Sequence, residues 1–160
     1  MQKKVMNKLV LFSFFALGSL LIPCKAKSID TIEVFHKNKE PSLQTLEKTN
    51  AVLDKYKGNH EIFYYVITDS VNVDLIRKYN LPDTHFPFAI VINGRYSANI
   101  NDNKIDFVHF PLFMHGIGRH EGNWSLDDLE AVLKDKSILL DKNVLSEEEH
   151  EEGEDESCPE

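Results

Sequence analysis

The segment from Tyr79 to Tyr96 constrains the fold of this 160-residue chain more than any other part of the sequence. Pro87 opens an apolar run, Phe88 to Ile92, and the run ends in Asn93-Gly94. Proline has no N–H to give to a sheet, so it belongs at the first residue of a strand. Asn-Gly suits the two positive-φ positions of a type I′ turn. The segment therefore predicts a strand that turns back tightly into a second strand.

The N-terminal residues have the pattern of a secretory signal. Lys3, Lys4 and Lys8 precede an apolar and small-residue stretch from Leu9 to Ile22, which is shorter than the roughly 20 residues of a membrane-spanning helix. We expect residues 1–26 to be a signal peptide cut after Ala26, and the mature protein to be periplasmic or secreted. A cysteine also follows Leu21-Ile22-Pro23, as in a bacterial lipoprotein box, although Pro23 departs from that pattern. A lipid anchor at Cys24 is therefore the alternative.

Acidic residues dominate the charge of the chain. There are 26 Asp and Glu against 18 Lys and Arg, for a formal net charge of −8. Removing a leader that contains lysines makes the mature chain more acidic still, which excludes nucleic acid as a partner. Residues 146–160 are rich in Asp and Glu and contain no Lys or Arg. We expect this segment to be a disordered acidic tail, which leaves residues 27–145 for one domain.

Periodicities between Ile29 and Tyr79 predict two strands and two helices in alternation. Residues 29–36 alternate like a strand, and Pro41-Ser42 fits the first turn of a helix that stops near Gly58. In that helix Leu43, Leu46, Leu53 and Tyr56 fall near one face. Residues 62–67 form an aromatic and β-branched run typical of a central strand covered on both faces. Asn72 is placed to cap a short helix through Tyr79.

The second half of the chain continues with the proline-led hairpin, an irregular stretch and a last helix. Residues 105–110 are compatible with a further strand. Ser125 and Asp128 form a capping-box-like start to the last helix, with Asp in place of the usual Glu. The predicted order is strand, helix, strand, helix, strand, strand, helix. This order predicts an α/β fold with a central mixed sheet flanked by helices and an insertion before the last helix.

The order of elements resembles the thioredoxin-like superfamily over about residues 28–136. Tyr79-x-Leu81, Pro87 and the following strand with Asn93-Gly94-Arg95-Tyr96 are similar to the hairpin of bacterial periplasmic disulfide oxidoreductases. The resemblance implies a thioredoxin-like fold with a cis peptide bond before Pro87. Two residues more than in typical thioredoxins separate Tyr79 from Pro87.

The chain departs from this family at its catalytic position. The resemblance places the usual Cys-x-x-Cys pair at Lys39, Glu40, Pro41 and Ser42, and none of these residues contains sulfur. Dithiol exchange needs a thiolate that forms a mixed disulfide, so this junction cannot perform it. The two cysteines, Cys24 and Cys158, lie at opposite ends of the chain. We expect a domain that is not an enzyme and needs no cofactor.

The resemblance also implies a peptide-binding loop that works without cysteine. In this superfamily the backbone before the cis proline pairs with an extended peptide. That role falls to Phe86 and Pro87, with His85 beside them. We therefore expect a protein or peptide partner in the cell envelope.

A metal-binding domain is the alternative function. The segment His85-Phe86-Pro87-Phe88 is echoed by His109-Phe110-Pro111-Leu112, and further donors follow. Imidazole with thioether suits copper, and imidazole with carboxylate suits zinc. The spacings match no metal motif of known local geometry. The candidate ligands are His85, His109, Met114, His115 and His120.

The aromatic residues of the insertion have two possible uses. Phe107, Phe110, Leu112 and Phe113 either extend the core or form an exposed apolar patch. Trp124, directly before the last helix, is placed to pack that helix against the core.

Overall fold

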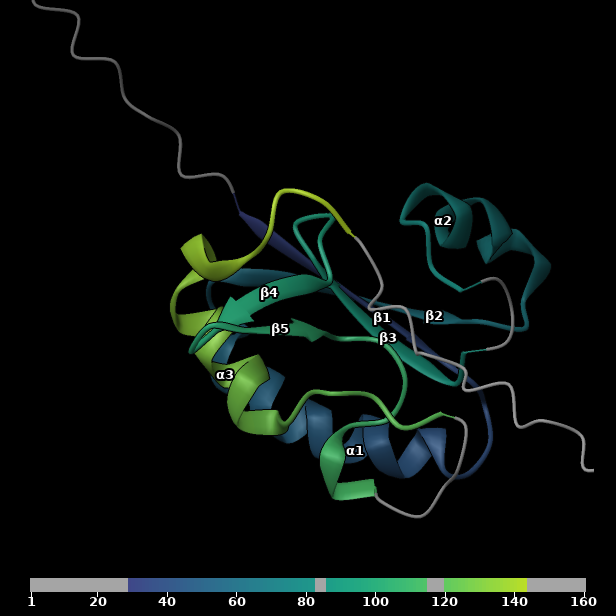
Figure 1. The fold of residues 1–160 in the computed structure, drawn as a ribbon. Helices are drawn as coiled ribbons and strands as arrows, with labels where there is room; N and C mark the ends of the chain where they lie inside the picture. The colour runs from purple at the N-terminus through teal and green to yellow at the C-terminus, as the bar shows by residue number, and fades with distance from the viewer. Residues whose placement is uncertain (1–28, 83–85, 115–119, 144–160) are drawn as a thin grey trace, which may run out of the picture.

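The computed structural model describes residues 29–82, 86–114 and 120–143 (Figure 1). The expected signal peptide, Cys24, Cys158 and the acidic tail lie outside these residues. The elements in chain order are β1 (Asp30–His36), α1 (Ser42–Leu53), β2 (His60–Val66), α2 (Val73–Lys78), β3 (Phe88–Ile92), β4 (Ser97–Ile100), β5 (Asn103–Asp106) and α3 (Leu126–Lys134). The chain is thus mixed α/β, and no helix of the described residues is long and apolar enough to cross a membrane.

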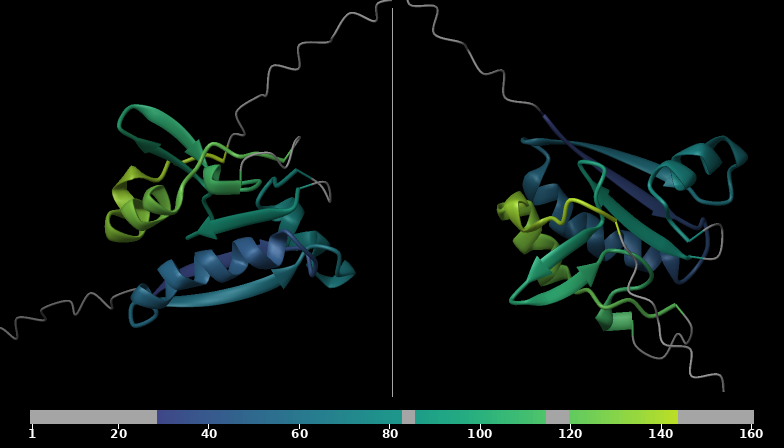
Figure 2. Two further views of the ribbon diagram at one scale, coloured as in Figure 1. Left: turned by 90° about the horizontal axis from the view of Figure 1, so that it is seen from below. Right: turned by 45° about the horizontal axis from the view of Figure 1, so that its top comes forward.

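The main sheet has three strands in the order β2-β1-β3. β1 pairs in parallel with β2, with Val34 beside Tyr64, and antiparallel with β3, with Val34 beside Ile90. A parallel neighbour requires a crossover, and α1 supplies it. β4 and β5 form a separate antiparallel pair. The sequence-based expectation that residues 62–67 form a central strand is wrong, because β2 lies at the border of the sheet (Figure 2).

The helices lie on opposite faces of this sheet (Figures 1 and 2). On one face the hydroxyl of Tyr64 in β2 donates to Asn50 of α1 at 2.9 Å, and α1 also contacts α3. On the other face the ring of Tyr79, directly after α2, lies 6.2 Å from that of Phe35 in β1. Successive strand residues point to opposite faces, so Phe35 and Phe63 face α2 whereas Val34 and Tyr64 face α1.

α1 is held by a different set of side chains from the predicted one. Its buried residues are Ser42, Thr45, Thr49, Val52 and Leu53, whereas Leu43 and Leu46 are only partly buried. The helix is also shorter than predicted, since Asp54–Tyr56 continues as a 3-10 turn. Of the predicted inward face, Leu53 alone is fully buried.

Two further predicted helix starts and the predicted tight turn can be compared with the structure. The capping box of Ser125 and Asp128 is confirmed: each side chain bonds the backbone N–H of the other residue. The positive-φ turn is confirmed too, with φ of 51° at Asn93 and 80° at Gly94. The predicted hairpin is wrong beyond the turn, because the strand after it, β4, pairs with β5 instead of β3. Asn72 precedes α2 but does not cap it through its side chain, which instead donates to the carbonyl of Val66 at 2.9 Å.

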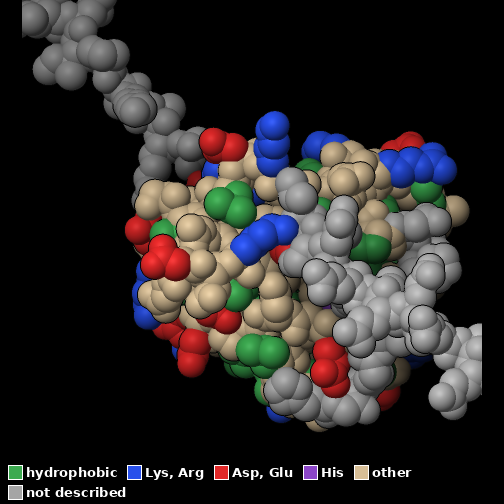
Figure 3. All heavy atoms as spheres, in the orientation of Figure 1, with side chains coloured by type: hydrophobic (Ala, Val, Ile, Leu, Met, Phe, Trp, Pro, Cys, Tyr) green, Lys and Arg blue, Asp and Glu red, His purple; other side chains and the backbone are tan. Residues whose placement is uncertain are grey.

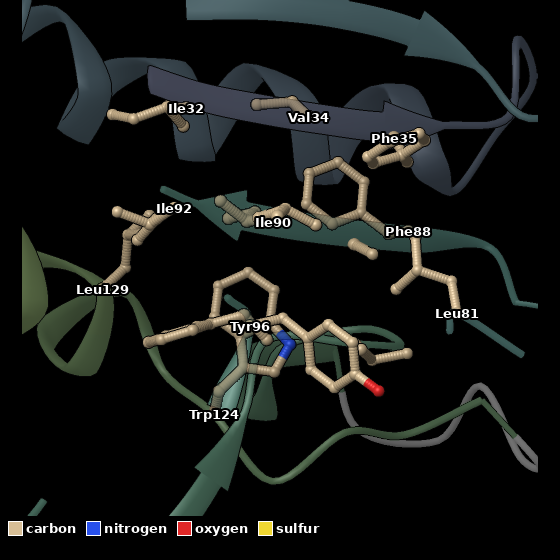
Figure 4. Close-up of a cluster of buried hydrophobic side chains, with 14 of the residues drawn as sticks. Ile32, Val34, Phe35, Leu81, Phe88, Ile90, Ile92, Tyr96, Trp124 and Leu129 are labelled. Atoms are coloured by element: carbon tan, nitrogen blue, oxygen red, sulfur yellow. The ribbon is translucent and has the colours of Figure 1, made fainter. Parts of the chain in front are cut away.

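The core is centred on β3, whose five residues are all buried. Beyond β3, Ala89 forms a bridge with Val108, and the N–H of Ile90 donates to the carbonyl of Phe107 at 2.9 Å. The fully buried Trp124 stacks on Phe88 with ring centroids 6.2 Å apart. Figure 4 shows Tyr96, Trp124 and Leu129 on the side of β3 away from β1. The irregular stretch after the hairpin therefore closes the β3 border of the sheet.

Candidate functional site

The loop before β3 does not have the predicted form. The cis peptide bond among the described residues joins Glu40 to Pro41, and the expectation of a cis bond before Pro87 is wrong. Phe86 is fully buried, and Pro87 is buried beside it. The carbonyl of Pro87 accepts from the N–H of Lys37 at 3.2 Å and from the hydroxyl of Ser42 at 3.0 Å. Phe86 and Pro87 thus serve the fold, since Pro87 extends the pairing of β3 with the end of β1. His85 lies outside the described residues.

The four residues of the predicted former redox junction contact this same loop. Lys39 and Glu40 are exposed, and Glu40 accepts from the N–H of Gln44 in the first turn of α1 at 3.3 Å. Pro41 is half-buried, and Ser42 is 1 % exposed. The Ser42 hydroxyl is occupied by the Pro87 carbonyl. The junction and the proline are therefore neighbours in space, and Ser42 is bonded to Pro87 rather than open to a ligand.

Two of the five predicted metal ligands come together. The rings of His109 and His120 have centroids 5.9 Å apart and planes inclined by 24°. The Phe110 N–H donates to the His120 carbonyl at 2.8 Å and holds the two segments in register. Met114 is buried, and His85 and His115 lie outside the described residues. Within the described segments no group of three His, Cys, Asp or Glu could hold a metal ion. A structural zinc site takes four ligands, so this pair alone does not form one.

The insertion aromatics divide between the two predicted uses. Phe107 and Phe110 are buried in the core, whereas Leu112 and Phe113 are 40 % and 38 % exposed. The ammonium of Lys48 on α1 lies 4.4 Å from the centre of the Phe113 ring. Trp124 is fully buried, and its indole N–H donates to the His109 carbonyl at 3.2 Å. The predicted structural use of Trp124 is confirmed.

The open border of the sheet lies along β2. The Ile67 N–H donates to the His36 carbonyl at 2.9 Å, which shows that odd-numbered residues of this segment direct their backbone groups toward β1. The backbone groups of Ile62 and Tyr64 consequently point away from the sheet. The Val66 carbonyl, which also points outward, is used by the N–H of Asp69 at 3.1 Å and by Asn72. Among the residues that the structure describes, none pairs with the outward groups of Ile62 and Tyr64.

Aromatic side chains flank these backbone groups on both faces of the sheet. Phe63 is 42 % exposed on the α2 face, and Tyr64 is 43 % exposed on the α1 face. An edge strand is commonly protected by lysine, proline or a bulge. β2 reads His-Glu-Ile-Phe-Tyr-Tyr-Val and contains no lysine, arginine or proline. We name Ile62, Phe63 and Tyr64 the β2 edge.

The charged side chains next to the β2 edge lie on the α2 face of the sheet. Glu33 in β1 is the neighbour of Phe63 and is buried. Glu61, two residues before Phe63 in β2, is exposed on the same face. The ammonium of Lys78 lies 2.9 Å from the Tyr79 hydroxyl, and this hydrogen bond raises the pKa of Lys78. Burial raises the pKa of the Tyr79 hydroxyl most, and a hydrogen bond with Glu33 and the negative charge of Glu33 raise it further. Because both pKa values are raised, both groups keep their protons at neutral pH: Tyr79 is a neutral phenol and Lys78 is a cationic amine.

Sequence reasoning missed the β2 edge for a topological reason. The run from Ile62 to Ile67 has the composition of a buried strand, and composition alone does not tell a central strand from a border strand. The usable signal was the strand–helix–strand connection, because it requires only one neighbouring strand for residues 62–67 and is compatible with a place at the border of the sheet. On the face shown in Figure 3, acidic and basic side chains are interspersed rather than gathered into one patch.

Comparison with protein-family models, with curated proteins and with solved structures finds no match to this chain.

Proposed function

We propose that this chain is an exported, non-catalytic domain of thioredoxin-like fold that binds an extended protein segment along the β2 edge. The observation that carries the proposal is a border strand with exposed aromatic side chains, whose outward backbone groups at Ile62 and Tyr64 pair with no residue of the described segments. Strand addition uses such backbone groups for affinity and side-chain contacts for specificity.

The arrangement of the main sheet supports the thioredoxin-like part of the proposal. β1 has one parallel neighbour, β2, and one antiparallel neighbour, β3, which agrees with the predicted mixed sheet. α1 and α2 on opposite faces agree with it as well. Export rests on the N-terminal sequence pattern alone, which lies outside the described residues.

The chemistry at the start of α1 supports a binding role over dithiol exchange. Residues 39–42 offer carboxylate, ammonium and hydroxyl groups but no thiol. The Ser42 hydroxyl is buried and donates to the Pro87 carbonyl, so it is not positioned as a nucleophile toward solvent. Recognition at the β2 edge, by contrast, uses backbone groups and aromatic side chains and needs no reactive group.

A peptide-display selection with a matched pair of variants tests this function. Ile62→Pro removes the outward N–H of Ile62 and places a ring on the edge, yet it leaves the ladder between β1 and β2 intact. Ile62→Ala removes a similar amount of side chain and keeps the N–H. We expect the unmodified chain and Ile62→Ala to retain extended apolar peptides, and Ile62→Pro to bind them at least about tenfold more weakly. Circular dichroism establishes that both variants are folded.

Two results would refute the proposal. One is a selection that yields no peptide above background with the unmodified chain. The other is a set of peptides that bind Ile62→Pro as tightly as Ile62→Ala, since such peptides use another surface.

A further inference from the structure

We infer that the segment bound at the β2 edge is β2 of a second copy of this chain, paired antiparallel with Phe63 facing Phe63. This inference rests on the proposed use of the β2 edge and identifies its occupant. It describes a two-fold symmetric dimer, in which one surface is complementary to itself.

The backbone determines the register of this pairing. Antiparallel partners whose backbone groups face each other exchange two hydrogen bonds, and the outward-facing residues are Ile62 and Tyr64. Pairing Ile62 with Tyr64 of the second copy satisfies the N–H and the carbonyl of both residues. Two-fold symmetry repeats the pair on the other side of the axis. Phe63 then lies on the axis, opposite Phe63 of the second copy.

The side chains are self-complementary in that register. Directly opposite residues share a face of the sheet, so Phe63 meets Phe63 on the α2 face, and Ile62 meets Tyr64 on the α1 face. Phe63 and Tyr64 are each exposed by more than two fifths, and this surface would become covered. Cross-strand aromatic pairs contribute roughly 0.2–1 kcal/mol each, in addition to burial. Every side chain in the centre of the interface is apolar or aromatic, as expected for the core of an interface.

The charges are compatible with this register as well. Glu61 is the charged residue within β2, and the register places it opposite Tyr65 of the second copy rather than opposite another Glu61. The Tyr65 ring lies 5.2 Å from that of Phe35, and Phe35 lies 6.2 Å from Tyr79, over which Lys78 is seated at 4.6 Å. Glu61 of each copy therefore lies on the same face of the joined sheet as the aromatic row Tyr65, Phe35 and Tyr79 of the other copy. A second copy thus supplies a strand and aromatic contacts, and the register keeps the two Glu61 carboxylates from lying directly opposite each other.

Symmetric disulfide trapping tests the occupant and the register in one experiment. The full chain carrying Cys24→Ser and Cys158→Ser receives either Phe63→Cys or Val71→Cys. Cα atoms of a non-hydrogen-bonded antiparallel pair lie about 4.5 Å apart, which is within the range of disulfides. Val71 is the control, because it is 77 % exposed and lies beyond the end of β2. We expect mild oxidation to convert Phe63→Cys into a disulfide dimer at least about tenfold faster than Val71→Cys.

Light scattering on the parent chain supplies the second readout. We expect its mass to rise from 18.4 kDa toward twice that value with concentration. Ile62→Ala loses only the side-chain contact with Tyr64, whereas Ile62→Pro also loses the outward N–H, so we expect the midpoint of Ile62→Pro to lie at least about tenfold above that of Ile62→Ala. A chain that stays monomeric throughout, or equal trapping of Phe63→Cys and Val71→Cys, would overturn self-pairing. If peptides selected on the unmodified chain still depend on the Ile62 N–H, the proposed function survives that result. If they do not, both proposals fail.

Discussion

The two borders of the main sheet are built from strands of similar composition but have opposite environments. β3 (Phe-Ala-Ile-Val-Ile) is buried along its whole length, whereas β2 (His-Glu-Ile-Phe-Tyr-Tyr-Val) is half exposed. At the β3 border the His109 N–H donates to the Phe88 carbonyl at 2.9 Å, and Trp124 packs behind it. No described residue does the same for β2. The difference teaches that a strand's place in the topology, more than its composition, decides whether its side chains are buried or exposed.

The largest contrast is expected from truncating one aromatic side chain at each border. Trp124→Ala removes a fully buried indole and should lower the free energy of unfolding by about 3–5 kcal/mol. Phe63→Ala removes a ring that is 42 % exposed and should cost about 1 kcal/mol or less. Urea unfolding followed by circular dichroism measures both values, at a concentration low enough to keep the chain monomeric. Equal losses would mean that the β2 border carries as much of the core as the β3 border.

Backbone packing should distinguish the borders in a second way. A Cβ atom added at Gly122 would lie 2.4 Å from the Val108 carbonyl oxygen and 3.0 Å from that of Phe110. Gly122→Ala should therefore push apart the segments that close the β3 border, at a cost of about 1–3 kcal/mol. Gly58→Ala, next to the start of β2, meets nothing within 4 Å and is the matched control. A melting temperature that falls equally in both variants would contradict tight closure at Gly122.

Alkaline pH should weaken the covered border more than the open one. Burial raises the pKa of Tyr96 to about 12, and the charge of Asp106 adds to this effect. Because the pKa in the folded chain lies above the ordinary tyrosine value of about 10, the stabilisation is complete below about pH 10 and is lost as pH rises toward 12. Tyr96→Phe should flatten this loss at a neutral-pH cost of about 1 kcal/mol, since the hydroxyl also donates to the Asn80 carbonyl. Tyr64→Phe should change the alkaline limb less. The free energy of unfolding, measured from pH 8 to 12 for both variants, tests this. A larger change of the alkaline loss in Tyr64→Phe than in Tyr96→Phe would contradict it.

Local patterns in the sequence predicted much of this fold because their causes are local. Asn93-Gly94 requires a left-handed turn, and Ser125 with Asp128 satisfies the first backbone N–H of α3, whatever lies elsewhere. The order of elements, apart from the additional strand β5, and the burial of Trp124 followed from periodicity and position.

The features that sequence missed depend on contacts between distant segments. The trans bond before Pro87 accompanies a carbonyl that Lys37 and Ser42 hold from the far end of β1 and the start of α1. The buried side of α1 includes Thr45 and Thr49, which are both fully buried, and hydrophobic periodicity does not register threonine. The β2 edge was hidden for the same reason, since its exposure is set by which strands lie next to β1.

Amide hydrogen exchange along β2 tests the central claim most directly. The N–H groups of Phe63 and Tyr65 point to β1 and should exchange slowly at every protein concentration, so they are internal controls. The account predicts that the Ile62 and Tyr64 amides exchange fast in dilute solution and at least about tenfold more slowly once a partner strand is bound. Two results would contradict this prediction. One is slow exchange of the Ile62 and Tyr64 amides in the dilute monomer, equal to that of Phe63 and Tyr65. The other is fast exchange of the Ile62 and Tyr64 amides at all concentrations and with every selected peptide.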